Sequence, residues 1–190
     1  MHTASKFVLA SAICTALAVS VVVSAGSVTT TPDKYDLKVT GGLAFSEFKG
    51  YEAWETMAVS HNGGALALIM GNPAMISALK SGIPGNGKPF PDGAKMAKVH
   101  WAAVKSETEP GNPFVPGGLG NVDFMVKDSK RFADSGGWGY AVFEYDEAPG
   151  KFRPGDLNSQ PPQANDAKCG FGCHTLVKDK DYVFTEYKKR

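Results

Sequence analysis

Apolar side chains recur at every third position between Phe45 and Met57, and charged residues lie between them. The apolar set is Phe45, Phe48, Tyr51, Trp54 and Met57. Such spacing is typical of a helix with one buried face. Ser46 suits the N-cap of this helix, and the Asn62-Gly63-Gly64 sequence suits its end. We therefore predict that the first element is a helix that begins at Ser46 and ends at this glycine pair.

Short apolar or alternating runs downstream predict strands. These runs cover residues 65–70, 94–106, 120–127, 138–146 and 181–187. A second helix is predicted from Pro73 to Lys80, because Asn72 suits its N-cap and proline is favoured at the first helical position. Brief helical turns are predicted at 128–132 and 174–178, and loops rich in glycine and proline at 83–93 and 148–166.

The order of these elements predicts the fold class. The helices are gathered early, and the strands that follow are joined mostly by short turns. This order favours an α+β fold, with a mainly antiparallel β-sheet and a few helices, over alternating β-α-β units. The 190 residues are 43% hydrophobic with a net charge of +1, which argues against disorder. Because no basic stripe is visible, we expect no nucleic-acid partner.

The N-terminus has the features of a secretory signal peptide. Lys6 precedes an apolar run from Phe7 to Val23, and small residues end the segment at Val23-Ser24-Ala25. We predict a signal peptide at residues 1–25, a polar arm at 26–44 and a folded domain at 45–190, exported to the periplasm. An uncleaved N-terminal anchor is the alternative, because the apolar run approaches the length that spans a membrane.

The most informative motif is Cys169-Gly170-Phe171-Gly172-Cys173-His174. Two cysteines followed at once by histidine are typical of c-type haem attachment, in which the thiols bind the haem vinyl groups and the imidazole binds the iron. Three residues separate these cysteines, where two are usual, so we expect one residue to bulge out. The alternatives are a Cys169–Cys173 disulfide, which suits an exported protein, and a zinc site that lacks a second ligand cluster.

Three segments resemble the cytochrome P460 family. Residues 127–140 (KDSKRFADSGGWGY) are similar to its K-D-S-x-R-F…G-x-W stretch. The Cys173-His174-Thr175 sequence and residues 181–185 (DYVFT) resemble its haem motif and last strand. Residues 90–93 (FPDG), followed by Lys98, resemble its F-x-D-G…K segment. The motifs occur in the family's order, and the resemblance extends from Phe45 to Tyr187.

The resemblance implies a periplasmic haem protein, usually a homodimer, with covalent haem c held by Cys169, Cys173 and His174. His174 is then the axial ligand of the haem iron. Enzymatic members of the family oxidise hydroxylamine with nitric oxide chemistry and carry a lysine bonded to the porphyrin edge. Other members resemble gas-binding or electron-transfer proteins. The implied partners are a small-molecule ligand or substrate and a redox partner protein.

Two further residues are candidates for catalysis. Lys80 lies near the end of the helix that precedes the FPDG loop, which makes it the candidate for the porphyrin-bonded lysine, with Lys88 as second choice. A lysine at a helix C-terminus is equally explained by the helix dipole, and we predict no cross-link. Asp166, close to Cys169, is a candidate proton relay or a simple turn residue. The rival function is a haem-free binding or structural module of the same fold.

Overall fold

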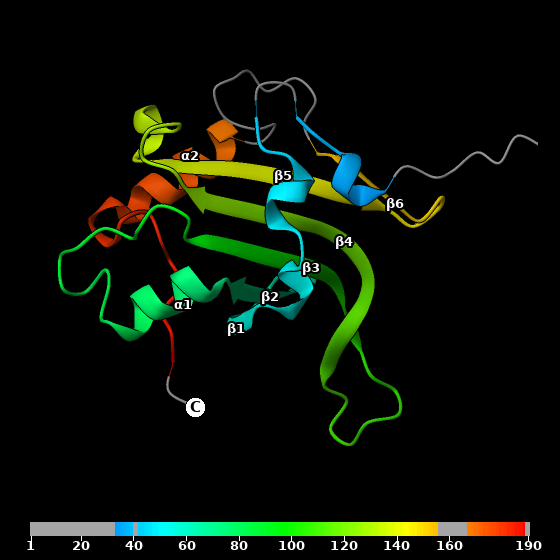
Figure 1. Cartoon of the computed structure of the whole chain (residues 1–190). Coiled ribbons are helices and arrows are strands. Elements are labelled where there is room, and N and C mark those ends of the chain that lie inside the picture. The colour runs from blue at the N-terminus through cyan, green and yellow to red at the C-terminus, as the bar shows by residue number, and fades with distance from the viewer. Residues whose placement is uncertain (1–32, 40–41, 156–166, 189–190) are drawn as a thin grey trace, which may run out of the picture. The chain divides into compact units, whose positions relative to one another are not determined.

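The computed structural model describes residues 33–39, 42–155 and 167–188, with only the backbone described for 167–169. One antiparallel sheet has the strand order β1-β2-β3-β4-β5-β6 (Figure 1). Its strands are β1 (Glu55–Asn62), β2 (Ala65–Gly71), β3 (Lys95–Lys105), β4 (Phe114–Lys127), β5 (Trp138–Asp146) and β6 (Lys151–Pro154). The sheet and a few short helices confirm the predicted α+β fold.

The helices are short. Two are α-helices, α1 (Pro73–Lys80) and α2 (Ala167–His174). The 3-10 helices are η1 (Lys34–Asp36), η2 (Phe45–Phe48), η3 (Tyr51–Ala53), η4 (Ala133–Ser135) and η5 (Thr175–Lys180). In α1 the Asn72 side chain accepts a hydrogen bond from the Met75 amide at 3.0 Å, as the sequence predicted. Within the described residues, no helix is both long enough and apolar enough to cross a membrane.

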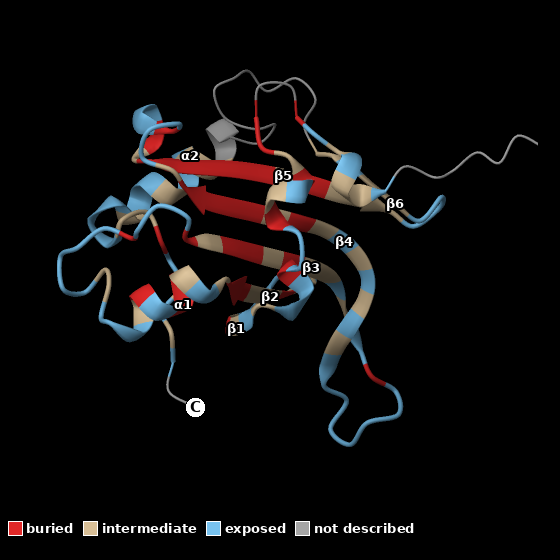
Figure 2. Ribbon diagram, in the orientation of Figure 1, coloured by how far each residue is buried: buried red, intermediate tan, exposed pale blue. Residues whose placement is uncertain are grey.

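Each face of the sheet has its own apolar cluster. On one face, Phe124 of β4 packs among aromatic residues of η2 and η3, with Phe48 stacked on it at 4.1 Å between ring centroids. On the other face, Met96 of β3 and Met125 of β4 are register partners and pack with residues of α1 and the C-terminal segment. The buried residues are therefore concentrated on the central strands (Figure 2).

The helix predicted from Ser46 to Asn62 is wrong. The structure has two 3-10 helices there, followed by strand β1. A repeat of three matches the 3.0 residues per turn of a 3-10 helix better than the 3.6 of an α-helix. The Asn62-Gly63-Gly64 sequence is a hairpin turn, because Asn62 pairs with Ala65 across it.

Other expectations also need correction. Residues 181–187 are not a strand, because Asp181 and Tyr182 have φ angles of 47° and 64°, which break an extended chain. The predicted loop at 148–166 contains β6, and β4 begins at Phe114, earlier than predicted. Part of the predicted arm belongs to the core, since Leu43 is fully buried. The predicted signal peptide lies outside the described residues.

Candidate functional site

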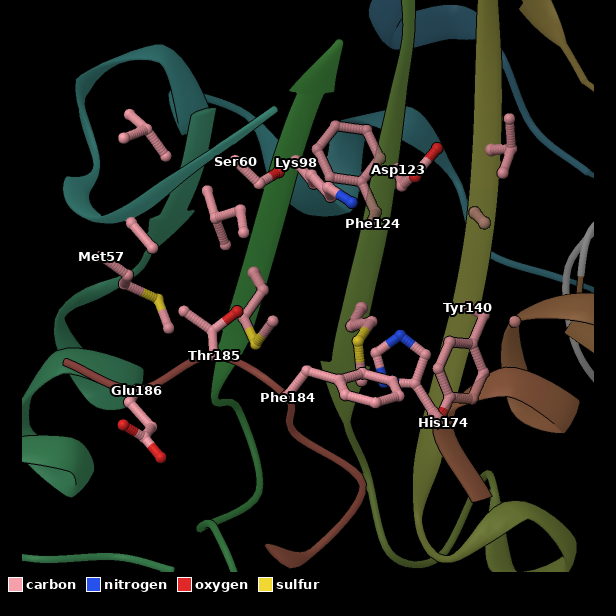
Figure 3. A pocket seen from close by; sticks show the side chains of 18 of the residues that line it. Met57, Ser60, Lys98, Asp123, Phe124, Tyr140, His174, Phe184, Thr185 and Glu186 are labelled. Atoms are coloured by element: carbon pink, nitrogen blue, oxygen red, sulfur yellow. The ribbon is translucent and has the colours of Figure 1, made fainter. Parts of the chain in front are cut away.

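A cavity of about 730 Å³ lies on the face of the sheet that carries Met96 and Met125. Its volume is in the range of small-molecule and cofactor sites. Strands β1 to β5 supply most of the wall, and α2 and the C-terminal segment supply the rest. Figure 3 shows His174 close to Tyr140 and Phe184, with Lys98 and Asp123 further along the strands.

His174 is the last residue of α2, and its ring lies between two aromatic rings. The centroid of Tyr140 is 5.2 Å from that of His174, and the centroid of Phe184 is 5.1 Å from it. The imidazole Nδ1 is 2.6 Å from the backbone carbonyl oxygen of Tyr182. A carbonyl can only accept, so Nδ1 carries the hydrogen and donates it. The Nε2 lone pair is therefore left to bind a metal.

The surroundings of His174 favour the neutral form of its ring. Burial is the main cause that lowers the pKa of this imidazole, because charging a buried group is unfavourable. The cation Lys98 acts in the same direction, while the Tyr182 carbonyl and Asp123 oppose it. A neutral imidazole with its second N–H held by a carbonyl is the usual state of a metal-binding histidine.

Helix α2 positions both cysteines of the motif. The helix is continuous from Ala167 to His174, and neither Gly170 nor Gly172 has a positive φ. The expected bulge is therefore absent from the described backbone. Cys169 and Cys173 are four residues apart in this helix, about one helical turn. The Cys173 thiol is exposed and forms no disulfide.

Gly170 allows α2 to lie close to strand β5. A Cβ atom at this position would be 3.0–3.1 Å from three atoms of Tyr140, two of them in its ring. Any larger residue at this position would force the Tyr140 side chain to shift, so glycine suits this close approach. The Tyr140 hydroxyl is buried and has no hydrogen-bond partner among the described residues, and burial raises the pKa of this phenol strongly. Such an unpartnered hydroxyl beside His174 suits a site completed by a bound group.

The cavity also contains charged residues to which the sequence did not assign a role. Lys98 and Asp123 are register partners on β3 and β4, and both line the wall. The Nε2 atom of His100 is 2.9 Å from Oδ2 of Asp123. Lys98 and His100 lie at alternate positions of the strand predicted at 94–106, and alternate residues of a strand share one face. This alternation was the sequence signal for the polar side chains on this face.

The structure does not bring Lys80 to this cavity. Its Nζ atom lies 3.3 Å from both carboxylate oxygens of Glu55 and over the Tyr187 ring. Lys88 is exposed on the loop after α1 and does not line the cavity either. The lysines at the cavity wall are Lys98 and Lys188. Asp166 lies outside the described residues.

A family model for cytochrome P460 matches residues 48–185, which is most of the chain. The chain belongs to the cytochrome P460 family. No curated protein sequence matches the chain significantly. Membership of the cytochrome P460 family implies a haem cofactor, and the residues at the cavity fit one. A neutral imidazole with a free Nε2 borders a mainly apolar cavity, and in the described part of the chain no group of three His, Cys, Asp or Glu side chains forms another metal site.

Proposed function

We propose that this cytochrome P460 family protein is an exported c-type cytochrome with His174 as the axial ligand of the iron. The observation that supports this most directly is the Nδ1–H bond from His174 to the Tyr182 carbonyl at the edge of the cavity. It fixes the tautomer in which Nε2 can bind iron and raises the basicity of that nitrogen.

The residues around the cavity have separate roles in this proposal. Cys169 and Cys173 would attach the haem through thioether bonds. Lys98 and Lys188 provide cations that suit the haem carboxylates. When bound, the haem supplies one-electron chemistry and an iron position for a small ligand. Small nitrogen oxides, hydroxylamine and nitric oxide among them, are the ligand class that the family suggests.

Other residues of the wall determine how polar the cavity is and where a proton can be held. Apolar side chains of β1 to β5 make up much of the cavity wall. Asp123 accepts a hydrogen bond from Nε2 of His100 when that nitrogen carries the hydrogen, which places an exchangeable proton at the wall. A proton donor at the wall suits redox chemistry that consumes or releases protons.

A second candidate function is gas binding or electron transfer without catalysis. The placement of Lys80 favours it over hydroxylamine oxidation, because the ammonium group pairs with Glu55 away from the cavity. The Glu55 and Tyr187 partners raise the pKa of Lys80, whereas attack on a porphyrin requires the neutral amine. A redox partner protein and a homodimer remain part of the proposal.

Haem attachment is tested by exporting the full chain into a periplasm that contains the cytochrome c maturation machinery. We expect a coloured protein whose haem resists extraction with acid and acetone. Cys169→Ala and Cys173→Ala should each keep the haem through the remaining thioether, and the double variant should release it. Colourless protein with both thiols oxidised would favour the haem-free module instead.

A further inference from the structure

We propose that the buried ion pair between Lys127 and Asp181 positions the axial imidazole of His174. The pair holds the backbone turn whose next carbonyl, that of Tyr182, accepts the Nδ1–H bond of His174. The proposal rests on the proposed function, in which His174 binds the haem iron.

The ion pair is buried and its hydrogen bonds are satisfied. The Lys127 Nζ atom lies 2.7 Å from Oδ1 of Asp181, and the two side chains are 7% and 13% exposed. The same Nζ donates to the Gly136 carbonyl at 2.9 Å and lies over the Trp138 ring. The second carboxylate oxygen of Asp181 accepts from the Phe90 amide at 2.7 Å. Paired and hydrogen-bonded on both sides, the charges hold one geometry.

The turn that Asp181 anchors has an unusual backbone. Asp181 and Tyr182 are consecutive residues in the left-handed region, with φ angles of 47° and 64°. This conformation is rare for a tyrosine, so surrounding contacts must impose it. The Asp181 carboxylate supplies one such contact through its bonds to Lys127 and Phe90.

The Tyr182 ring supplies the other contact. It packs against Gly136, where a Cβ atom would lie only 2.1 Å from a ring carbon of Tyr182. Gly136 has a φ of 68° and also gives its carbonyl to Lys127. One short turn after η4 therefore holds both the ammonium group and the tyrosine ring.

The ion pair acts on His174 through one residue, Tyr182. Fixing the backbone of Asp181 and the ring of Tyr182 leaves the Tyr182 carbonyl aimed at Nδ1, 2.6 Å away. A strong acceptor at Nδ1 makes Nε2 a better electron donor to the iron. Lys127 and Asp181 are thus positioning residues, since neither needs to touch the haem. They also explain why separate sequence segments, around residues 90, 127–138 and 181–183, must meet.

The test compares haem-loaded wild type with a Lys127→Met/Asp181→Asn double variant. Replacing both partners avoids leaving one buried charge unpaired, and asparagine tolerates the left-handed conformation. In the double variant we expect the ferrous iron–histidine stretch in resonance Raman spectra to move to lower frequency. The midpoint potential should rise, because weaker donation stabilises ferric iron less.

Arg131→Met is the matched control. Arg131 lies in the same segment as Lys127, but its guanidinium pairs with Glu47 on the other side of the sheet at 2.8 Å. We expect this variant to lose stability without moving the Raman band or the potential. Gly136→Ala is a second variant that tests the positioning role, because the added methyl group displaces Tyr182 without removing a charge. It should shift the Raman band and the midpoint potential in the same direction as the double variant.

The outcomes separate the two proposals. Haem spectra that are identical in the wild type and in His174→Ala would refute His174 ligation and with it the proposed function. A wild-type band whose frequency is unchanged in the double variant and in Gly136→Ala would overturn the positioning role alone. Equal shifts in Arg131→Met and in the double variant would also overturn it, since any loosening of the fold would then suffice.

Discussion

Asp92 shows how one exposed side chain joins two loops beside the site. Its carboxylate accepts hydrogen bonds from the Ser129 hydroxyl and from the Ser129 amide, both at 2.8 Å. These bonds favour the charged form, and the bond from the hydroxyl is the main cause that holds the pKa of Asp92 below its usual range. The contact ties the FPDG loop to the segment that begins at Lys127.

The lowered pKa of Asp92 predicts a pH-dependent contribution to stability. A carboxyl that binds protons more weakly when folded stabilises the fold above its unfolded pKa of about 4, and this contribution is lost as the pH falls through the folded value. Asp92→Asn should therefore be less stable than wild type at neutral pH, with the difference vanishing in acid. Urea unfolding across this range measures it, with the exposed Asp134→Asn as control. A difference that persists at the most acidic pH would contradict the prediction.

Lys80 gives a second prediction at this scale. Because its ammonium group pairs with Glu55 outside the cavity, no haem should be bonded to it. Tryptic mass spectrometry of the haem-loaded protein should recover the Lys80 peptide unmodified, and Lys80→Arg should have a wild-type ferrous spectrum. A haem-bearing Lys80 peptide would refute this and make hydroxylamine oxidation the favoured function.

Single residues differ in how far the sequence could identify them. His174 was predicted because the adjacent Cys173 marks it. The Tyr182 carbonyl was not, because its role depends on two left-handed residues and not on its side chain. Asp123 was missed because a strand carboxylate acquires a role only when its sheet neighbours are known.

At the scale of elements, the two glycines of α2 have different surroundings. Gly172 has no atom within 4 Å of an added Cβ, whereas Gly170 meets Tyr140. Alanine stabilises a helix interior by about 0.5–1 kcal/mol relative to glycine. Gly172→Ala should therefore raise the free energy of unfolding by about that amount, and Gly170→Ala should give no gain. Thermal denaturation of both variants measures this, and equal stabilisation by both would show that α2 does not pack against Tyr140.

The elements themselves were partly predictable. Strands β2, β3 and β5 and helix α1 were predicted within a few residues, because local composition and capping define them. The region from Phe45 to Asn62 was not, because a repeat of three does not separate an α-helix from 3-10 helices that lead into a strand. The strand expected at 181–187 failed because Lys127 and Phe90 hold Asp181 in a turn, and those contacts are distant in sequence.

At the scale of the whole described unit, the two faces of the sheet have different roles. One face packs the aromatic cluster around Phe124, and the other carries the cavity with His174 at its edge. The sequence motifs that resemble the cytochrome P460 family belong to the face that carries the cavity. Phe90, Lys127 and His174 are linked through Asp181 and Tyr182 by three hydrogen bonds. These motifs therefore contribute to one support for His174, the axial ligand that we propose.

The most direct test of the central claim is the absorption spectrum of the exported full chain beside that of His174→Ala. Ligation of iron by His174 predicts a Soret band in the wild type. The variant should keep its covalently attached haem, because both cysteines remain, but with a shifted Soret band. Identical spectra for the two proteins, or a colourless wild type produced with the maturation machinery, would contradict the account.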